Sequence, residues 1–153
     1  MLTAQVRDAA ARSVLCWFAT VDAEGQPNVS PKEVWAVFDE RHLVIADIAS
    51  PGSARNVGAD AKVCVSFVDV FVQKGFKIAG RARRYAAGEP EFARWAAPLL
   101  PVAGERFPLR GVFVVEATRV TPIVAPSWAF YPDQTTEAGQ VAQALARYGV
   151  SRP

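Results

Sequence analysis

Two short stretches decide the fold: Val29-Ser-Pro-Lys-Glu-Val34 and, beyond the next turn, Ile45-Ala-Asp-Ile-Ala-Ser-Pro-Gly-Ser-Ala-Arg-Asn56. In the second stretch an apolar strand runs directly into a turn of small residues, and this turn predicts a short helix over residues 53–59. A helix that begins this way presents free backbone N–H groups at its positive end. The pattern therefore predicts a place where a phosphate group binds.

Four polar side chains surround this predicted phosphate position. Ser53 supplies a hydroxyl, Arg55 a positive charge and Asn56 an amide, and Lys32 lies within reach on the preceding strand. A simpler interpretation fits the same residues, because Ser53 can cap the helix while Arg55 points into solvent. The residues of the motif leave both interpretations open.

The rest of the chain is rich in strands. Apolar runs separated by turn residues predict six antiparallel strands, over residues 14–21, 28–38, 42–47, 62–72, 73–85 and 110–124. Helices are predicted at 2–12, 53–59, 89–100 and 135–148, the last with its cap at Thr135 or Thr136. The regular alternation of strand and helix that a doubly wound fold needs is missing. We expect a mainly β fold, a six-stranded antiparallel barrel with short peripheral helices, in one domain of residues 1–153.

Composition favours an assembly of copies. Hydrophobic residues make up 51% of the 153 residues, more than the usual share of a globular domain. The strand predicted at 62–72 is apolar on both faces, since Val63 and Val65 alternate with Cys64 and Val68. One face can line the barrel interior, while the other needs a cover that a second copy would supply. We therefore expect a homodimer.

Charge and targeting signals narrow the classes of function. The formal net charge is only +2, and the basic cluster divides between two faces of its strand, with Arg81 and Arg83 opposite Arg84. A nucleic acid partner is therefore not expected. Cys16 and Cys64 lie far apart within apolar runs and are expected to be reduced core residues. Without a signal peptide or an apolar run of about 20 residues, we expect a cytoplasmic protein that binds no membrane.

Side chains for acid–base or metal chemistry are scarce. His42 is the only histidine, and no nucleophile elbow, metal-ligand spacing or glycine-rich phosphate loop accompanies it. Asp47 and Asp69 lie within apolar strands, where each fits either a ligand contact or a local structural bond. The sequence identifies no catalytic residue, so a bound cofactor would carry any difficult chemistry.

Five segments in a fixed order resemble the pyridoxamine 5′-phosphate oxidase-like family of FMN-binding split barrels. The first is the predicted first hairpin, Phe18-Ala-Thr-Val-Asp-Ala-Glu-Gly-Gln-Pro-Asn-Val-Ser-Pro-Lys32. The others are Leu43-Val-Ile-Ala-Asp47, Ser53-Ala-Arg-Asn56, Lys74-Gly-Phe-Lys-Ile-Ala-Gly80 and Thr121-Pro-Ile-Val-Ala-Pro-Ser127. Each segment is a weak signal alone, but their order and spacing make the resemblance specific over residues 14–130.

The resemblance implies a homodimer of split barrels with two FMN sites, each built from residues of both chains. In such proteins the phosphate lies near the helix after the third strand, and Ser30 and Lys32 would face the ribityl chain or the phosphate. The backbone of residues 46–47 would meet the flavin ring edge, and Lys74 would come from the same or the partner chain. The cofactor-binding residues carried over in this way are Ser30, Lys32, Ala46, Asp47, Ser53, Arg55, Asn56 and Lys74.

The activity implied by the resemblance is that of an FMN-dependent oxidoreductase with an unknown small-molecule substrate. Trp128 or Trp35 would wall the flavin, while Trp17 and Trp95 are expected in the core. Alternatives are a non-catalytic flavin carrier or redox sensor, and a deazaflavin-dependent reductase. The true oxidases carry a basic pair in the phosphate loop and an arginine-rich C-terminal segment. This chain lacks both, so pyridoxamine 5′-phosphate is expected to be a poor substrate.

Overall fold

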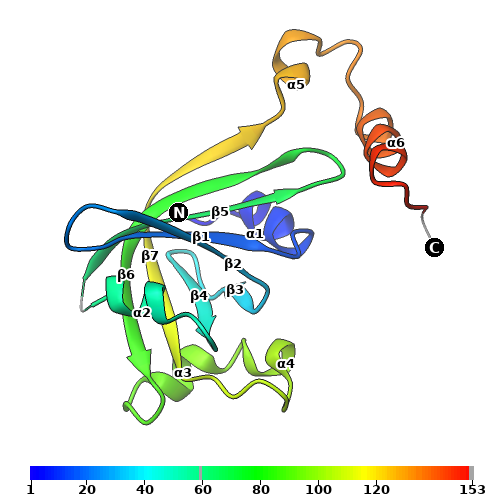
Figure 1. Ribbon diagram of the computed structural model, residues 1–153. Helices are drawn as coiled ribbons and strands as arrows, with labels where there is room; N and C mark the ends of the chain where they lie inside the picture. Colours follow the sequence, from blue (N-terminus) through cyan, green and yellow to red (C-terminus); the bar gives the residue numbers. More distant parts are fainter. Residues whose placement is uncertain (59, 152–153) are drawn as a thin grey trace.

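A curled antiparallel sheet forms the body of the molecule (Figure 1). The computed structural model describes residues 1–58 and 60–151. Within these residues seven strands lie in the order β2-β1-β5-β6-β7-β4-β3, each antiparallel to its neighbours. They are β1 (Cys16–Val21), β2 (Pro27–Lys32), β3 (Trp35–Val37), β4 (His42–Asp47), β5 (Ala61–Asp69), β6 (Lys74–Ala86) and β7 (Gly111–Val124). The expected mainly β, antiparallel fold is confirmed.

The seam of the barrel lies between β2 and β3. These strands occupy opposite edges of the sheet, yet only Glu33 and Val34 separate them in the chain. The sheet must therefore curl until its two edges meet. At the seam the chain stops pairing with β1 and starts pairing with β4, and the Ala46 N–H donates to the Val34 carbonyl. The single strand predicted at 28–38 is thus two strands, which explains why the sheet has seven strands and not six.

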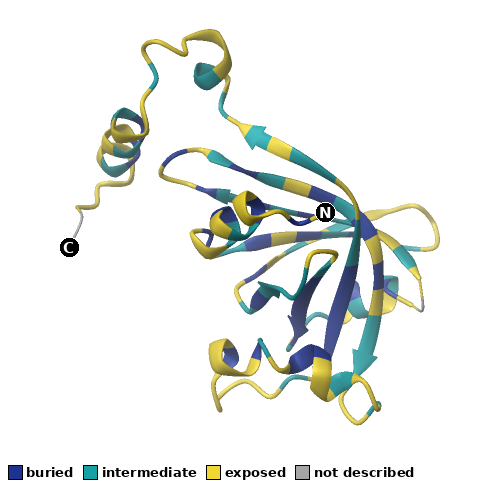
Figure 2. Cartoon of the chain, turned by 180° about the vertical axis from the view of Figure 1, so that it is seen from behind, coloured by how far each residue is buried: buried dark blue, intermediate teal, exposed yellow. Residues whose placement is uncertain are grey.

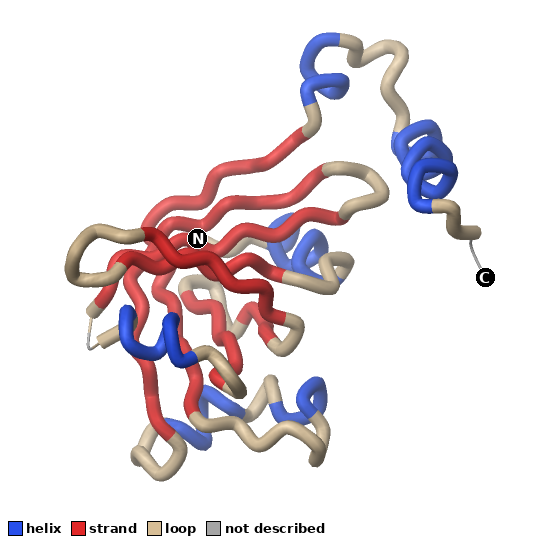
Figure 3. Tube along the Cα trace, viewed as in Figure 1, coloured by secondary structure: helices blue, strands red, loops and turns tan. Residues whose placement is uncertain are grey.

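Short helices surround the sheet (Figure 3). They are α1 (Ala4–Ala11), α2 (Pro51–Asn56), α3 (Phe92–Ala96), α4 (Leu100–Ala103), α5 (Pro126–Phe130) and α6 (Glu137–Tyr148). The helix predicted at 89–100 is divided into α3 and α4, because Pro98 lacks the N–H that a continuous helix needs. The helix predicted at 53–59 begins at Pro51 and ends at Asn56, and Ala59 lies outside the described residues. Within the described part of the chain, no helix has the length and apolar composition needed to cross a bilayer.

Two apolar clusters give the sheet its shape. The first fills the barrel interior, where the Phe18 and Phe113 ring centroids lie 5.2 Å apart, and it includes Val6 of α1 and Leu2 just before that helix. The second lies outside the barrel, where Trp95 on α3 packs over β4 and β7. The core position expected for Trp95 is confirmed. Because it is covered from both sides, β4 is buried along nearly its whole length.

The outward side of β1 and β5 has no such cover. The core position predicted for Trp17 is wrong: this residue is 47% exposed, because alternation along β1 turns it away from buried Phe18. Cys64 and Val68 on β5 are partly exposed, whereas Val65 faces the interior and is fully buried. The strand predicted at 62–72 ends at Asp69, and its outer side stays uncovered by the described residues.

β7 continues past the barrel into a C-terminal arm, which we define as residues 125–151. The arm carries α5 and α6, stands away from the barrel and is mostly exposed (Figure 2). α6 begins at Thr136, whose hydroxyl accepts a hydrogen bond from the Gly139 N–H at 3.0 Å. It ends at Gly149, whose φ of +65° lies in the left-handed region. Of the two caps that the sequence allows, Thr136 is the one used.

Candidate functional site

A cleft of about 700 Å³ opens at the seam between β2 and β3. Its walls come from both sides of the seam, from the turn between β4 and α2, and from the loop before β7. The lining residues are Leu15, Asn28, Ser30, Pro31, Lys32, Glu33, Val34, Ala46, Ile48, Ala49, Ser50, Pro51, Gly52, Ser53 and Phe107. The stretches 29–34 and 45–56, which are separate in the sequence, therefore meet at one cavity.

Part of the cleft carries a row of polar side chains. Asn28, Ser30 and Lys32 lie on the same face of β2, because side chains alternate along a strand. The Asn28 side-chain nitrogen donates to the Ser53 hydroxyl at 3.4 Å, and the Ser30 and Ser53 hydroxyl oxygens lie 3.2 Å apart. This row ties β2 to α2 and offers hydroxyl and amide groups to a polar ligand.

Lys32 ends this row and places a buried positive charge in the cleft. Only 8% of the residue is exposed, and its Nζ donates to the Ser50 hydroxyl. Burial lowers the pKa of the Lys32 ammonium, while the Asp47 carboxylate acts in the opposite direction. Among the described residues, no carboxylate forms an ion pair with Lys32. A buried cation without a carboxylate partner is suited to an anionic ligand.

The remaining lining is largely apolar and includes residues that sequence reasoning missed. Val34 and Ile48 are partly buried, and Phe107 is 49% exposed at the edge of the cleft. Nothing in the loop around Phe107 marks it as a ligand residue. Asn28 was also missed, although its two-residue spacing from Ser30 would have found it. A polar row beside an apolar lining suits a ligand with a polar chain and a flat apolar ring.

Asp47 follows Ala46 on β4, yet only Ala46 lines the cleft. The Asp47 carboxylate accepts a hydrogen bond from Arg84 Nε at 2.8 Å, and its side chain is only 4% exposed. Arg84 also donates to the Arg110 carbonyl at 3.1 Å. In this chain the Asp47 carboxylate is therefore engaged by Arg84, and β4 turns Ala46 toward the cleft.

The predicted phosphate residues on α2 separate in space. Ser53 is 2% exposed and lines the cleft, while Arg55 is exposed and lies outside the lining. The Asn56 side-chain nitrogen donates to the Thr20 hydroxyl at 3.0 Å, which fastens α2 to β1. The interpretation of Ser53 as a helix cap is wrong, since Ser50 occupies the cap position before Pro51. The structure thus brings Ser30, Lys32, Ala46 and Ser53 together at the cleft.

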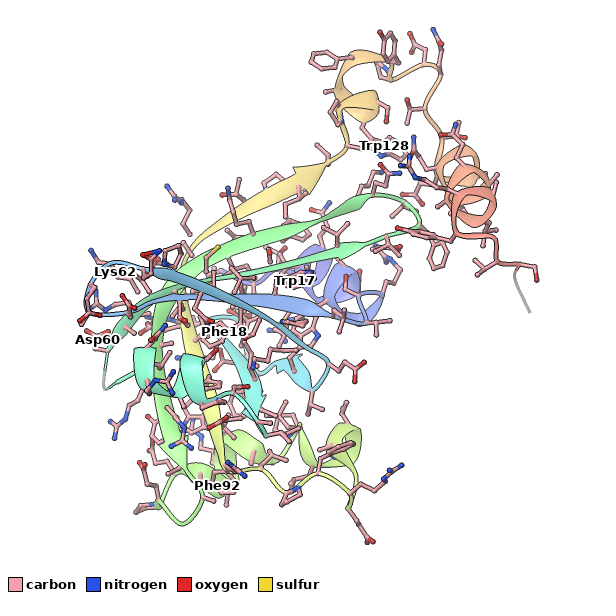
Figure 4. The ribbon with its side chains drawn as sticks, in the orientation of Figure 1. Trp17, Phe18, Asp60, Lys62, Phe92 and Trp128 are labelled. Atoms are coloured by element: carbon pink, nitrogen blue, oxygen red, sulfur yellow. The ribbon has the colours of Figure 1, made fainter. Side chains whose placement is uncertain are left out.

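Lys74 and Trp128 lie together, but away from this cleft. The Lys74 Nζ sits 3.5 Å from the centre of the Trp128 ring and 3.2 Å from a carboxylate oxygen of Glu137. The Trp128 ring N–H donates to the Val72 carbonyl at 3.1 Å. Figure 4 shows Trp128 at the base of the arm, remote from α2. Within one chain this pair fastens the arm to the β5–β6 hairpin, and its predicted contact with a cofactor stays a prediction.

His42 and Trp35 also lie outside the cleft. The His42 Nδ1 is 2.9 Å from both carboxylate oxygens of Asp39. Trp35 packs in the barrel interior with its ring centroid 4.9 Å from that of Phe67, so it does not wall the cleft. In residues 1–58 and 60–151, histidine, cysteine and acidic side chains form no group of three that could hold a metal ion.

Comparison with protein families decides where this fold and cleft belong. The model of the family described as pyridoxamine 5′-phosphate oxidase matches residues 2–123. The chain belongs to this family. The match covers the whole cleft and all strands except the last residue of β7, and the arm lies beyond it. None of the curated proteins compared with the chain matches it.

Solved structures agree with the pyridoxamine 5′-phosphate oxidase fold. Group A Streptococcus HupZ is 24% identical, with 78% of this chain and 92% of that chain covered and a TM-score of 0.66. A putative pyridoxamine 5′-phosphate oxidase from Lactobacillus delbrueckii is 23% identical, with 78% and 93% covered and a TM-score of 0.65. An FMN-binding protein from Syntrophomonas wolfei is 18% identical, with 78% and 84% covered and a TM-score of 0.59. These likenesses show the split-barrel fold.

Proposed function

We propose that the cleft at the seam binds FMN and that the protein is a flavin-dependent oxidoreductase acting on a small molecule as a homodimer. Membership of the pyridoxamine 5′-phosphate oxidase family supports a flavin cofactor. The observation that carries the proposal is Lys32, a buried cation without a carboxylate partner among the described residues, at the end of a row of hydroxyl and amide groups. FMN combines an anionic phosphate, a polyhydroxyl chain and a flat ring, which are the chemistries that this lining accommodates.

The side chains of the cleft have separate tasks in this proposal. Lys32 and Ser50 hold the phosphate, because charge-assisted hydrogen bonds are about twice as strong as neutral ones. Ser30 and Ser53 bind the polyhydroxyl chain, and the apolar lining at Ile48 excludes water from the ring. When bound, FMN supplies the site with reversible acceptance of a hydride. The protein's own contribution is to bind, to orient and to exclude water.

The homodimer is supported by the uncovered outer side of β1 and β5, where Trp17 is 47% exposed. Burying apolar surface contributes about 25 cal/mol per Å², so a second copy placed there would stabilise both chains. A stable monomer at micromolar concentration in light scattering would reject this part of the proposal.

The absorption spectrum of the purified protein tests the cofactor directly. We expect the two visible bands of an oxidised flavin, release of FMN on denaturation, and rebinding of one FMN per chain. Bleaching of these bands by NADH or NADPH, followed by reoxidation with an added acceptor, would support turnover. Binding without any such reaction would identify a carrier or sensor, and a preference for a deazaflavin would overturn the FMN assignment.

Pyridoxamine 5′-phosphate is proposed to be a poor substrate. Its oxidation needs a second phosphate-binding site, for the substrate, built from basic residues. The C-terminal segment offers only Arg147, which is exposed on α6, and Arg152, which lies outside the described residues. We expect a kcat/KM well below about 10⁴ M⁻¹s⁻¹, the low end for enzymes. Turnover above that value by FMN-loaded protein would restore the oxidase assignment.

A further inference from the structure

An outward-facing row of residues crosses five strands of the sheet, with small residues on the middle three. Strand register places Val29 opposite Ala19, Ala19 opposite Cys64, Cys64 opposite Ala79, and Ala79 opposite Arg119. Ala19, Cys64 and Ala79 are all partly exposed, and Trp17 stands in the next row with 47% of its surface exposed. We call this surface the outer face. Its short side chains leave the backbone accessible beside an exposed tryptophan, and a tryptophan ring can pack against other aromatic rings.

The outer face also carries positive charge that no described residue pairs with. Lys77 and Arg119 lie close enough to Cys64 to act on its pKa, which burial raises and these two charges lower. Lys62 lies two residues before Cys64 on the same side of β5. Among the described residues, none of these three cations forms an ion pair. A partner for this face should therefore combine aromatic side chains with negative charge.

The arm has this chemistry and holds it in a defined position. Phe130 is 74% exposed and Tyr131 is 60% exposed, and Asp133 follows them without an ion-pair partner in the described residues. The segment is ordered by the Thr135 hydroxyl, whose single proton lies between the carbonyls of Ser127 and Tyr131, with oxygen–oxygen distances of 2.9 Å and 2.8 Å. The arm therefore presents two aromatic rings and a carboxylate at little further cost in conformational entropy.

The arm of a chain stands away from the outer face of the same chain. Trp17 on that face and Trp128 at the base of the arm lie apart in Figure 4, and the arm projects from the barrel in Figures 1 and 2. In a two-fold pair of chains, the exposed arm and the exposed outer face are both covered, because each arm can contact the outer face of the other copy. The arm also lies beyond the family match at residues 2–123, so this contact would belong to this chain and not to the barrel as such.

We propose that the arm docks on the outer face of a second copy of this chain, with Phe130 and Tyr131 over Cys64 and Asp133 toward Lys77 and Arg119. The contact rests on the homodimer proposed above and names the surfaces that form it. Each pair of chains contains the contact twice, which closes the assembly as a dimer.

Cross-linking between two different chains tests the contact. One chain carries Phe130→Cys together with Cys64→Ser, and the other, bearing a different tag, keeps the natural Cys64. Both retain Cys16, which is 0% exposed and out of reach of reagents. After mixing and treatment with a short bismaleimide, we expect a covalent heterodimer whose peptides join positions 130 and 64. The matched control, Leu100→Cys with Cys64→Ser, places the thiol on the exposed surface of α4 and should give no such product.

A second measurement separates the arm contact from the dimer and from the cofactor. We expect Phe130→Ser with Tyr131→Ser to raise the dimer dissociation constant about tenfold or more in sedimentation, the scale of interface hot spots, while each chain still folds and keeps its far-UV spectrum. An intact dimer without the 130–64 product would overturn the arm contact alone. A monomeric wild-type chain would overturn the contact and the homodimer together, and loss of FMN binding bears only on the proposed function.

Discussion

One lysine lies at the seam of the barrel and another lies on β6 beside the base of the arm, and the two have different roles. Lys32 at the seam is 8% exposed, donates to a serine hydroxyl and forms no ion pair among the described residues. The Lys74 side chain at the arm is 35% exposed, with its charge engaged by Glu137 and by the Trp128 ring. A lysine paired within the chain fastens two segments together, whereas a buried lysine outside any ion pair is available to an anionic ligand.

The largest effect predicted from this comparison is the loss of affinity when the flavin lacks its phosphate. We expect FMN to bind about 100-fold more tightly than riboflavin, because one or two charge-assisted contacts to the phosphate contribute about 1.5–3 kcal/mol. Titration calorimetry with both flavins measures the ratio of their dissociation constants. Equal affinities would show that Lys32 does not bind the phosphate.

The pH dependence of that ratio follows from Lys32. Burial lowers the pKa of the ammonium, and only the charged form attracts the phosphate. The preference for FMN should therefore shrink as the pH rises through the lowered pKa, before the ordinary lysine range near 10.4 is reached. A preference that stays constant over this range would contradict a role for Lys32.

The next largest effect is expected when a positive charge is removed from the protein. We expect Lys32→Ala to weaken FMN binding about tenfold or more, and Arg55→Ala, on the exposed side of α2, to change it by less than about twofold. The sequence alone predicts a loss of FMN affinity at both positions, whereas the burial of the two side chains in the structure predicts it only for Lys32. Quenching of flavin fluorescence measures affinity, and thermal melting checks that the Lys32 variant folds. Full affinity in both variants would reject the carried-over phosphate site.

A smaller loss of FMN affinity is expected when the Ser53 hydroxyl in the same cleft is removed. Ser53→Ala removes the hydroxyl that Asn28 and Ser30 approach, so we expect a three- to tenfold loss of FMN affinity, about 0.5–1.5 kcal/mol. Thr118→Ala, which removes an exposed hydroxyl of β7, is the matched control. Equal affinities for the two variants would show that the polar row does not contact the cofactor.

At the other end, in the arm, the expected effect is on local opening of the chain. Trp128→Leu removes the contact with Lys74 and the hydrogen bond to Val72, which together contribute about 1–2 kcal/mol. Amide hydrogen exchange should quicken in residues 125–151, while the strands of the barrel keep their protection. Exchange that quickens equally in barrel and arm would mean that the two regions unfold as one unit.

Much of the seam was predictable because its logic is local. Alternation along a strand puts Ser30 and Lys32 on one side, and the small-residue turn after β4 brings Ser53 near them. The cap at Thr136 and the glycine end of α6 are equally local. The antiparallel class of the fold followed from turns and apolar runs, and the family from the order of weak motifs.

Contacts between distant segments decided the rest. The break at residues 33–34 arises because β2 pairs with β1 while β3 pairs with β4. No residue within 28–38 indicates that change of pairing partner. Trp17 faces outward because the register of β1 gives the interior to Phe18, although both residues are aromatic.

The sequence by itself determined the antiparallel strands apart from the break at residues 33–34, the threonine cap of α6, the shared side of Ser30 and Lys32 on β2, and the family of the chain, because each depends on neighbours within a few residues or on the order of short motifs. Only the tertiary structure decided that Lys32 is buried without an ion pair among the described residues, that Arg84 engages Asp47, and that Lys74 meets Trp128 at the arm. The physical reason is that burial and ion pairing depend on which distant strands become neighbours, and the sheet order β2-β1-β5-β6-β7-β4-β3 sets those neighbours.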